Sequence, residues 1–189
     1  MVLRLPVGSF IGYNFVQEEV FMTALSILNV KEFMNILLRS DAFDSFLLSE
    51  GAITTYMTFH LDGHSKTDFF SPEDETYTLV SQEKYVPFSL VRPACFDLIK
   101  GRRTPSSFQF VFQLSSHNQA RTLAAIDSSF STEDISGMYL NLKYQNRQLT
   151  CTTGVSCRIF SLDKSLEQSW DELVKRFLKT HEIAFEELL

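Results

Sequence analysis

The stretch SSFQFVFQL, residues 106–114, decides the fold class. Its apolar side chains stand at every second position, namely Phe108, Phe110, Phe112 and Leu114. Because successive side chains of a strand point to opposite faces, this period of two predicts a strand with one buried face. These apolar side chains alternate along the segment with Gln109, Val111 and Gln113.

The segments around this strand repeat the pattern. Residues 138–144 alternate in the same way, and the odd positions from Leu149 to Ile159 share one face. Upstream, residues 52–61 alternate and end at Asp62-Gly63, a pair typical of a two-residue hairpin turn. Short strands are expected at 23–28 and 85–90. The polar segment from 115 to 131 gives no clear period.

Three helices are predicted between and after these strands. Asn29 is expected to cap a helix that has Glu32 at its third position. A second helix should follow Ser89 or Arg92 as its cap and stop at Gly101, with Pro93 at the first helical position if Arg92 is the cap. A C-terminal helix over 164–181 carries an apolar stripe of Leu166, Trp170, Leu173, Val174, Phe177 and Leu178. The tail HEIAFEELL could extend this helix or dock separately.

The order of elements suggests a weak internal repeat. ILNVKEFMNILL (27–38) aligns without gaps with SLVRPACFDLIK (89–100), and an acidic segment separates the two halves. The halves, 22–70 and 85–160, each read strand, helix, strand and strand. The sequence therefore predicts an α+β fold, with an antiparallel sheet packed against helices on one face and a C-terminal amphipathic helix.

Composition restricts the classes of function. The chain has 189 residues, 18 of them Phe, with 17 Lys and Arg against 23 Asp and Glu. One domain over 22–189 with a large core is expected. The net charge of −6 argues against a generally basic nucleic-acid coat. No apolar run approaches the length of a membrane span. Three cysteines without a C-x-x-C pair predict reduced thiols in a cytoplasmic protein.

The first 21 residues form a separate question. The codons for Glu18-Glu19-Val20 can contain a bacterial ribosome-binding site just before Met22. We therefore expect translation to start at Met22, with 1–21 as a non-native extension. The alternative is a real, disordered arm, and no signal peptide is indicated.

No catalytic or metal-binding pattern stands out. His60 and His64 flank Asp62, but in a hairpin at 62–63 they would point to opposite faces, so we expect no metal site. Cys151 and Cys157 share a face six residues apart and are expected to pack in the core. No hydrolase elbow, phosphate-binding loop or dinucleotide fingerprint is present. We expect no cofactor and a binding protein rather than an enzyme.

The remaining candidate is a basic cluster of Arg92, Lys100, Arg102 and Arg103, whose only acidic neighbour in the sequence is Asp97. On a helix Arg92 and Lys100 lie roughly 80° apart, and the two arginines follow just beyond the helix end. Such cations can contact phosphates, and arginine forks add geometry to charge. They can also simply complement the helix dipole.

The segments MTALSILNVKEFMNILL, FLLSEGAITTYMTFHLDG and RPACFDLIKGRRTPSSFQFVFQL carry a resemblance that covers about residues 22–180. The chain resembles a family of small uncharacterised Firmicutes proteins that form a domain of unknown function. The resemblance implies a cytoplasmic bacterial protein that starts at Met22, and it assigns no catalytic residue.

The repeated strand–helix–strand order also looks like one domain of a DNA sliding clamp. In those rings basic helices face DNA, which would give a role to Arg92, Lys100, Arg102 and Arg103, while the first helix offers Lys31 and Arg39 beside Glu32. Three alternatives remain open: a clamp-like DNA-associated module that self-associates, a module that binds a protein through the helix around Trp170, and a small enzyme.

Overall fold

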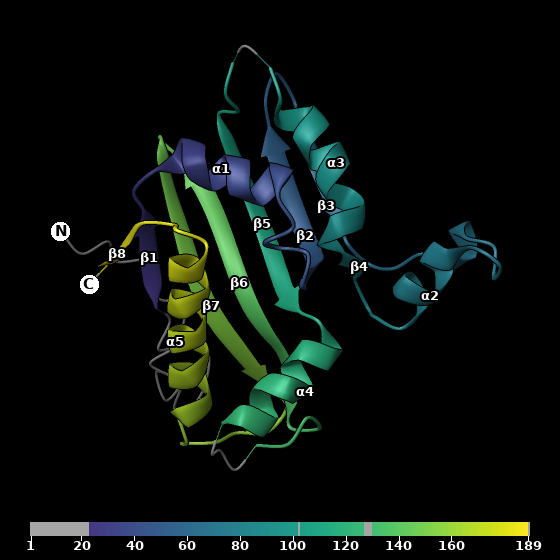
Figure 1. The fold of residues 1–189 in the computed structure, drawn as a ribbon, viewed down its shortest axis with the longest axis vertical. Helices are drawn as coiled ribbons and strands as arrows, with labels where there is room; N and C mark the ends of the chain where they lie inside the picture. The colour runs from purple at the N-terminus through teal and green to yellow at the C-terminus, as the bar shows by residue number, and fades with distance from the viewer. Residues whose placement is uncertain (1–22, 102, 127–129, 189) are drawn as a thin grey trace, which may run out of the picture.

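The fold is built on one antiparallel sheet. A computed structural model describes residues 23–101, 103–126 and 130–188; the predicted extension 1–21 and its start at Met22 lie outside them. Eight strands pair in the order β3-β2-β5-β6-β7-β1-β8, and β4 also pairs with β2 (Figure 1). All pairs are antiparallel. The strands are β1 (Ala24–Ile27), β2 (Phe46–Thr54), β3 (Thr58–Asp62), β4 (Val86–Pro87), β5 (Ser107–Leu114), β6 (Ile135–Gln145), β7 (Gln148–Cys157) and β8 (Phe185–Leu188).

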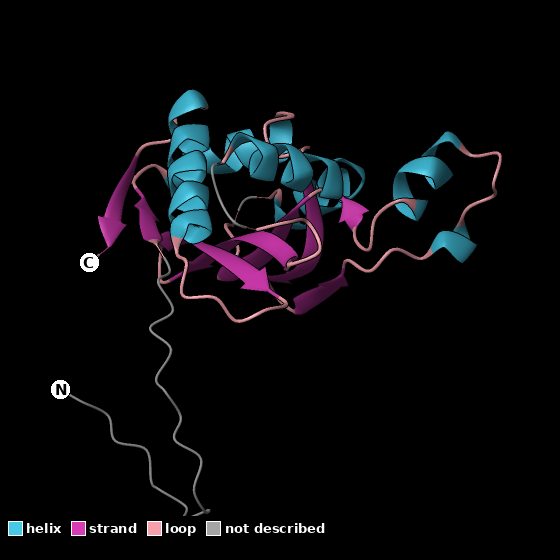
Figure 2. Ribbon diagram, turned by 90° about the horizontal axis from the view of Figure 1, so that it is seen from below, coloured by secondary structure: helices cyan, strands magenta, loops and turns pink. Residues whose placement is uncertain are grey.

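Helices cover one face of this sheet, as Figure 2 shows. They are α1 (Val30–Arg39), α2 (Glu75–Ser81), α3 (Phe88–Ile99), α4 (Ser116–Ala125) and α5 (Ser165–Thr180). A short 3-10 turn, η1 (Thr67–Phe69), precedes α2, and the two project together beyond the β3 side of the sheet (Figure 1). The predicted α+β class, the single helical face and the C-terminal helix are confirmed. Because β1 pairs with β7, the sheet joins strands from both predicted halves.

Aromatic rings fill the space between sheet and helices. All four alternating residues of β5 are buried, as predicted. Phe88 of α3 packs on Phe110 and Phe112 with ring centroids 6.3 and 4.8 Å away. Phe43, in the loop before β2, is fully buried and lies among four further rings, those of Phe33, Phe46, Phe112 and Phe177. The core therefore rests on ring contacts that tie loop, helices and sheet together.

The first helix begins as the sequence predicts. The side chain of Asn29 accepts a hydrogen bond from the backbone N–H of Glu32 at 3.2 Å and donates one to its carboxylate at 2.9 Å. This reciprocal arrangement satisfies a donor that the helix itself cannot pair. Phe33, Leu37 and Leu38 form the buried side of this helix.

The predicted hairpin was wrong. The chain turns at 55–57, where the N–H of Thr55 donates to the carbonyl of Met57 at 2.9 Å, and Asp62 is the last residue of β3 rather than part of a turn. Ile53 consequently faces Phe59 across the pair. Ile53 and Phe59 nevertheless share one face of the sheet, as the alternation over 52–61 predicts, because a turn of three residues keeps odd-numbered positions on the same face. His60 pairs with Ala52, and His64 forms an isolated bridge with Tyr85.

The start of the second helix was also predicted wrongly. The expected strand over 85–90 is reduced to β4, and α3 begins at Phe88 with Pro87 as its cap. Pro93 therefore lies inside the helix, where it removes one backbone hydrogen bond. The buried ring of Phe88 explains this start, because burying a phenylalanine offsets a large part of the cost of an interior proline.

Two segments left open by the sequence have clear structures. The polar segment after β5 contains α4, in which only Gln119 and Leu123 are buried. The C-terminal tail docks separately: β8 pairs antiparallel with β1, placing Phe185 opposite Ile27 and Leu188 opposite Ala24.

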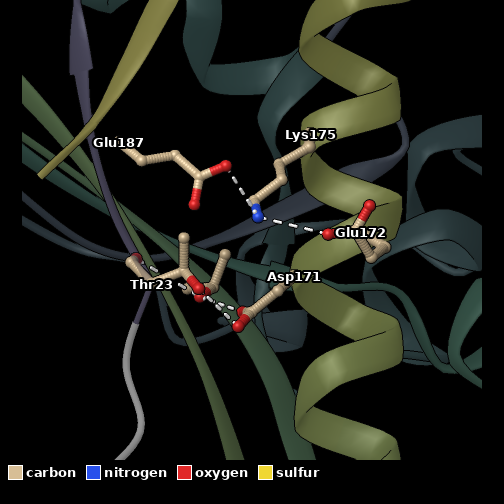
Figure 3. Close-up of polar contacts among 6 residues, drawn as sticks. Thr23, Asp171, Glu172, Lys175 and Glu187 are labelled. Atoms are coloured by element: carbon tan, nitrogen blue, oxygen red, sulfur yellow. Dashed lines mark hydrogen bonds and ion pairs between the residues drawn. The ribbon is translucent and has the colours of Figure 1, made fainter. Parts of the chain in front are cut away.

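Polar contacts fasten α5 to the sheet (Figure 3). Asp171 accepts a hydrogen bond from the hydroxyl of Thr23 at 2.5 Å and another from the hydroxyl of Thr153. One turn further on, Lys175 contacts Glu172 at 3.1 Å and Glu187 of β8 at 3.0 Å. The second contact is the link between α5 and the edge strand β8.

We expect Lys175→Gln to loosen β8 without unfolding the sheet. The side chain of Lys175 is only 15% exposed, so its loss leaves Glu187 without its partner at a partly covered site. Amide hydrogens of 185–188 should exchange several-fold faster, while those of β5 and β6 keep their protection. Arg176→Gln, on the exposed side of the same helix, is the control. Unchanged exchange in β8 would contradict the prediction.

The stabilisation from the Lys175–Glu187 ion pair depends on pH. The hydrogen bond from Lys175 to Glu187 is the largest cause of a raised Lys175 pKa; burial lowers this pKa, and the hydrogen bond to Glu172 raises it further. A raised pKa means that the stabilisation is present at neutral pH and is lost as the pH rises through the folded-state pKa, above the ordinary lysine value.

Candidate nucleic-acid interface

Arg92 is held by an acidic partner that the sequence did not reveal. It lies on α3, and its guanidinium Nη1 is 3.0 Å from Oδ1 of Asp44, in the loop between α1 and β2. Only 22% of the Arg92 side chain is exposed. Asp97, the acidic neighbour of the cluster in the sequence, is therefore not the partner of Arg92. Arg92 fastens α3 to the loop that carries Phe43, and little of its charge reaches the surface.

Lys100 lies at the end of α3 and is exposed. Its ammonium is 2.7 Å from the carboxylate of Asp97, with more than half of each side chain in water. An exposed pair of this kind is weak and exchanges readily for a stronger anion. Lys100 also lies over the ring of Phe96, 5.7 Å from its centroid.

A second cation reaches the same ring from another helix. Arg39, in the last turn of α1, has its Cζ atom 6.0 Å from the centroid of Phe96. Helices α1 and α3 lie side by side over the same face of the sheet (Figure 1). The fold thus brings together Arg39 and Lys100, which are 61 positions apart in the sequence.

The end of the cluster continues past α3. Arg103 is exposed, two residues beyond the exposed Gly101. Arg102 lies outside the described residues. We call Arg39, Lys100 and Arg103 the basic surface. In the sequence Arg39 is connected only with the first helix, and no local pattern could have placed it beside Phe96.

Packing beneath the basic surface fixes the two helices. Cys95 of α3 is fully buried, and Phe33 and Leu37 of α1 are buried in the same core. Arg39, in the last turn of α1, and Lys100, at the end of α3, are exposed.

Titratable groups elsewhere offer little chemistry. Nδ1 of His64 is 2.6 Å from Asp62, and hydrogen bonds from the backbone and side chain of His64, followed by Lys66, hold the pKa of the Asp62 carboxyl well below its usual range. In the described ranges, no three His, Cys, Asp or Glu side chains gather closely enough to bind a metal ion.

The thiols are buried rather than activated. Desolvation raises the pKa of Cys95 and Cys151 to about 12, so neither is a thiolate at neutral pH. Cys157 is half-buried, and burial raises its pKa as well. All three are free thiols, as the sequence predicts.

None of the described helices is both long and apolar enough to cross a bilayer.

Comparison with known proteins yields one match. A model of a family described as a family of unknown function (DUF5721) matches residues 36–186. This range lies close to the span of about 22–180 over which the sequence resembles a domain of unknown function. Neither the curated proteins nor the solved structures give a match.

Proposed function

The chain belongs to DUF5721, a family of unknown function, and we propose that it is a non-enzymatic binding protein that contacts the phosphates of DNA through its basic surface. The observation that carries the proposal is the meeting of Arg39 and Lys100 over one ring, Phe96. Cations from two helices form a surface that neither helix offers alone.

The charges on this surface are available to a ligand. Arg39 and Arg103 are exposed. Lys100 has an exposed, replaceable partner in Asp97. Arg102, the next residue in the sequence before Arg103, would add a fourth cation. A phosphate backbone is the ligand with closely spaced negative charges that such a surface suits, and arginine binds phosphate with two parallel hydrogen bonds.

A clamp-like arrangement on DNA is the more specific form of this proposal. The order β1-α1-β2-β3 is followed, after η1 and α2, by β4-α3-β5, and helices α1 and α3 pack together on one face. A clamp-like module would present that helical pair to the DNA duplex. Arg92 takes a supporting role in this proposal, because its pair with Asp44 positions α3.

The test is fluorescence anisotropy of a labelled DNA duplex with the full chain. Three phosphate contacts predict that affinity falls about 40-fold between about 50 mM and 200 mM salt. The Arg39→Glu/Lys100→Glu/Arg103→Glu variant should bind at least 10-fold more weakly at the lower salt and lose most of the salt dependence.

A matched control separates local contact from net charge. Lys143→Glu/Arg158→Glu/Arg176→Glu makes the same change in charge at exposed positions on β6, after β7 and on α5. It should keep most of the affinity. Absence of binding at low salt, or an equal loss in both variants, would overturn the proposal.

A further inference from the structure

A projecting arm leaves apolar side chains in water. We define the arm as residues 66–82, which contain η1 and α2 and extend past the β3 side of the sheet (Figures 1 and 2). Phe69 is 83% exposed and Leu79 is 55% exposed. The interior of the arm is ordered: Val80 is fully buried, and the rings of Phe69 and Phe70 meet edge to face at 5.2 Å. Two large exposed apolar side chains on one projecting arm can be buried by contact with another molecule.

A groove with an apolar lining lies elsewhere on the chain. It lies between α4 and α5 and has a volume of about 380 Å³. Phe46 and Leu114 of the sheet line it together with Trp170, Leu173 and Phe177 of α5. Its predominantly apolar lining would bind an aromatic side chain favourably.

Arg121 gives the groove its charge. It is exposed on α4 and is the only ionisable side chain in the lining. Among the described residues it has no ion pair. A partner with an apolar anchor and neighbouring carboxylates would match both the lining and this cation.

The arm has that composition. Its single cation, Lys66, stands against four carboxylates, those of Asp68, Glu73, Asp74 and Glu75. The other exposed apolar segments complement Arg121 less well. Tyr56 and Met57 have no acidic residue beside them in the sequence, and Ile159 to Leu162 lie between Arg158 and Lys164 with only Asp163 as an acid. Charge therefore favours the arm as the occupant.

Helix α4 connects arm and groove. The carboxylate of Glu83, just after the arm, accepts hydrogen bonds from the backbone N–H of Ser116 at 2.9 Å and from its hydroxyl at 2.7 Å. Ser116 is the first residue of α4, whose later residues Arg121 and Thr122 line the groove. If a two-fold axis near α4 relates two copies, the arm of each copy enters the groove of the other, and the same contact forms twice.

We propose that the chain self-associates by placing Phe69 of one copy in the α4–α5 groove of a second copy, with the acidic arm facing Arg121. The proposal does not depend on DNA contact, because the basic surface and the groove share no residue.

The experiment is sedimentation velocity of the full chain from about 1 to 200 μM, a range that suits a small, reversible interface of the transient class. The wild type should form a reversible dimer. Phe69→Ser should weaken the dimer at least 100-fold, because the anchor is lost twice in a reciprocal pair. Arg121→Glu should weaken it at least 10-fold. Both substitutions are at exposed positions, so the fold should remain intact.

A control variant and a fluorescence measurement accompany the sedimentation experiment. Phe160→Ser removes another exposed phenylalanine, 76% exposed, and should leave the dimer unchanged. Trp170 is the only tryptophan of the chain and lines the groove, so its emission should shift as the wild type dimerises and stay constant in Phe69→Ser. A monomer at every concentration would overturn the proposal, and so would a dimer that Phe160→Ser abolishes or that both Phe69→Ser and Arg121→Glu leave intact.

Discussion

Gly63→Ala should destabilise the protein by about 3 kcal/mol or more. Gly63 follows β3 directly and is buried. Its N–H donates to the carbonyl of Ser49 at 3.2 Å, and its carbonyl accepts from the N–H of Val86 at 2.9 Å. The residue is thus hydrogen-bonded on both sides between β2 and β4. A Cβ atom placed there would lie 1.8 Å from the carbonyl oxygen of Leu48, a backbone atom that cannot rotate away.

Relief of that clash requires β2 to move. Leu48 pairs with Phe112 of β5 and with Val86 of β4, next to the register shift between Leu48 and Glu50. A displacement would therefore disturb two strand pairs and the buried side chain of Leu48. Urea unfolding followed by circular dichroism would measure the change in the free energy of unfolding.

Gly154→Ala is the matched control. Gly154 lies on β7, and a Cβ atom there meets nothing within 4 Å. Its substitution should change the free energy of unfolding by less than about 0.5 kcal/mol. A Gly63→Ala variant as stable as the Gly154→Ala variant would show that the crossing of β2 and the segment after β3 is looser than described here.

Phe43→Ala should cost about 4 kcal/mol, equivalent to a fall in melting temperature of about 10 °C for a chain of this size. Phe43 has no exposed surface. Its ring centroid lies 5.7 Å from that of Phe33, 5.8 Å from that of Phe112 and 5.1 Å from that of Phe177. It therefore joins α1, the sheet and α5 at one point.

The size of the effect follows from the cavity. Alanine leaves a ring-sized space whose walls belong to three different elements, so the walls cannot collapse together. Phe43→Leu should cost much less, because it refills most of the volume. Phe160→Ala, at a position that is 76% exposed, should be nearly neutral. Differential scanning calorimetry of the three variants provides the comparison, and a loss below about 1 kcal/mol in Phe43→Ala would contradict the packing described.

These stability variants also bear on function. Asp44, next to Phe43, holds Arg92 on α3. A collapse around Phe43 would therefore shift the loop that fixes α3 and, with it, the position of Lys100. Weaker DNA binding in Phe43→Ala would be an indirect effect, whereas the basic-surface variant changes the charges and leaves the buried rings in place.

Local periodicity determined much of the architecture. The alternation in 107–114 sets which side of β5 is buried whatever its neighbours, because a strand has two faces and an unbroken apolar row must take the dry one. The stripes of α1 and α5 act in the same way at a period of 3.6. Asn29 capped its helix because that interaction lies within one turn of chain.

Tertiary contacts decided the rest. The chain turned at 55–57 despite the turn signal at Asp62-Gly63, because β2 extends back to Phe46 and gains a partner in β5 along its whole length. Helix α3 began at Phe88 because that ring had a place on Phe110 and Phe112. The sequence could not resolve these choices, since each depends on residues more than twenty positions away.

The same distinction between local and tertiary effects applies to the candidate site. From the sequence alone, Arg92, Lys100 and Arg103 are expected on one helix or just beyond its end, because residues close together along a helix stay close in space. Only the tertiary structure paired Arg92 with Asp44 and brought Arg39 to Phe96 beside Lys100. The packing of α1 against α3 sets the distance between charges on the two helices, and residues far apart in the sequence fix that packing, namely the buried core side chains and the Arg92–Asp44 pair.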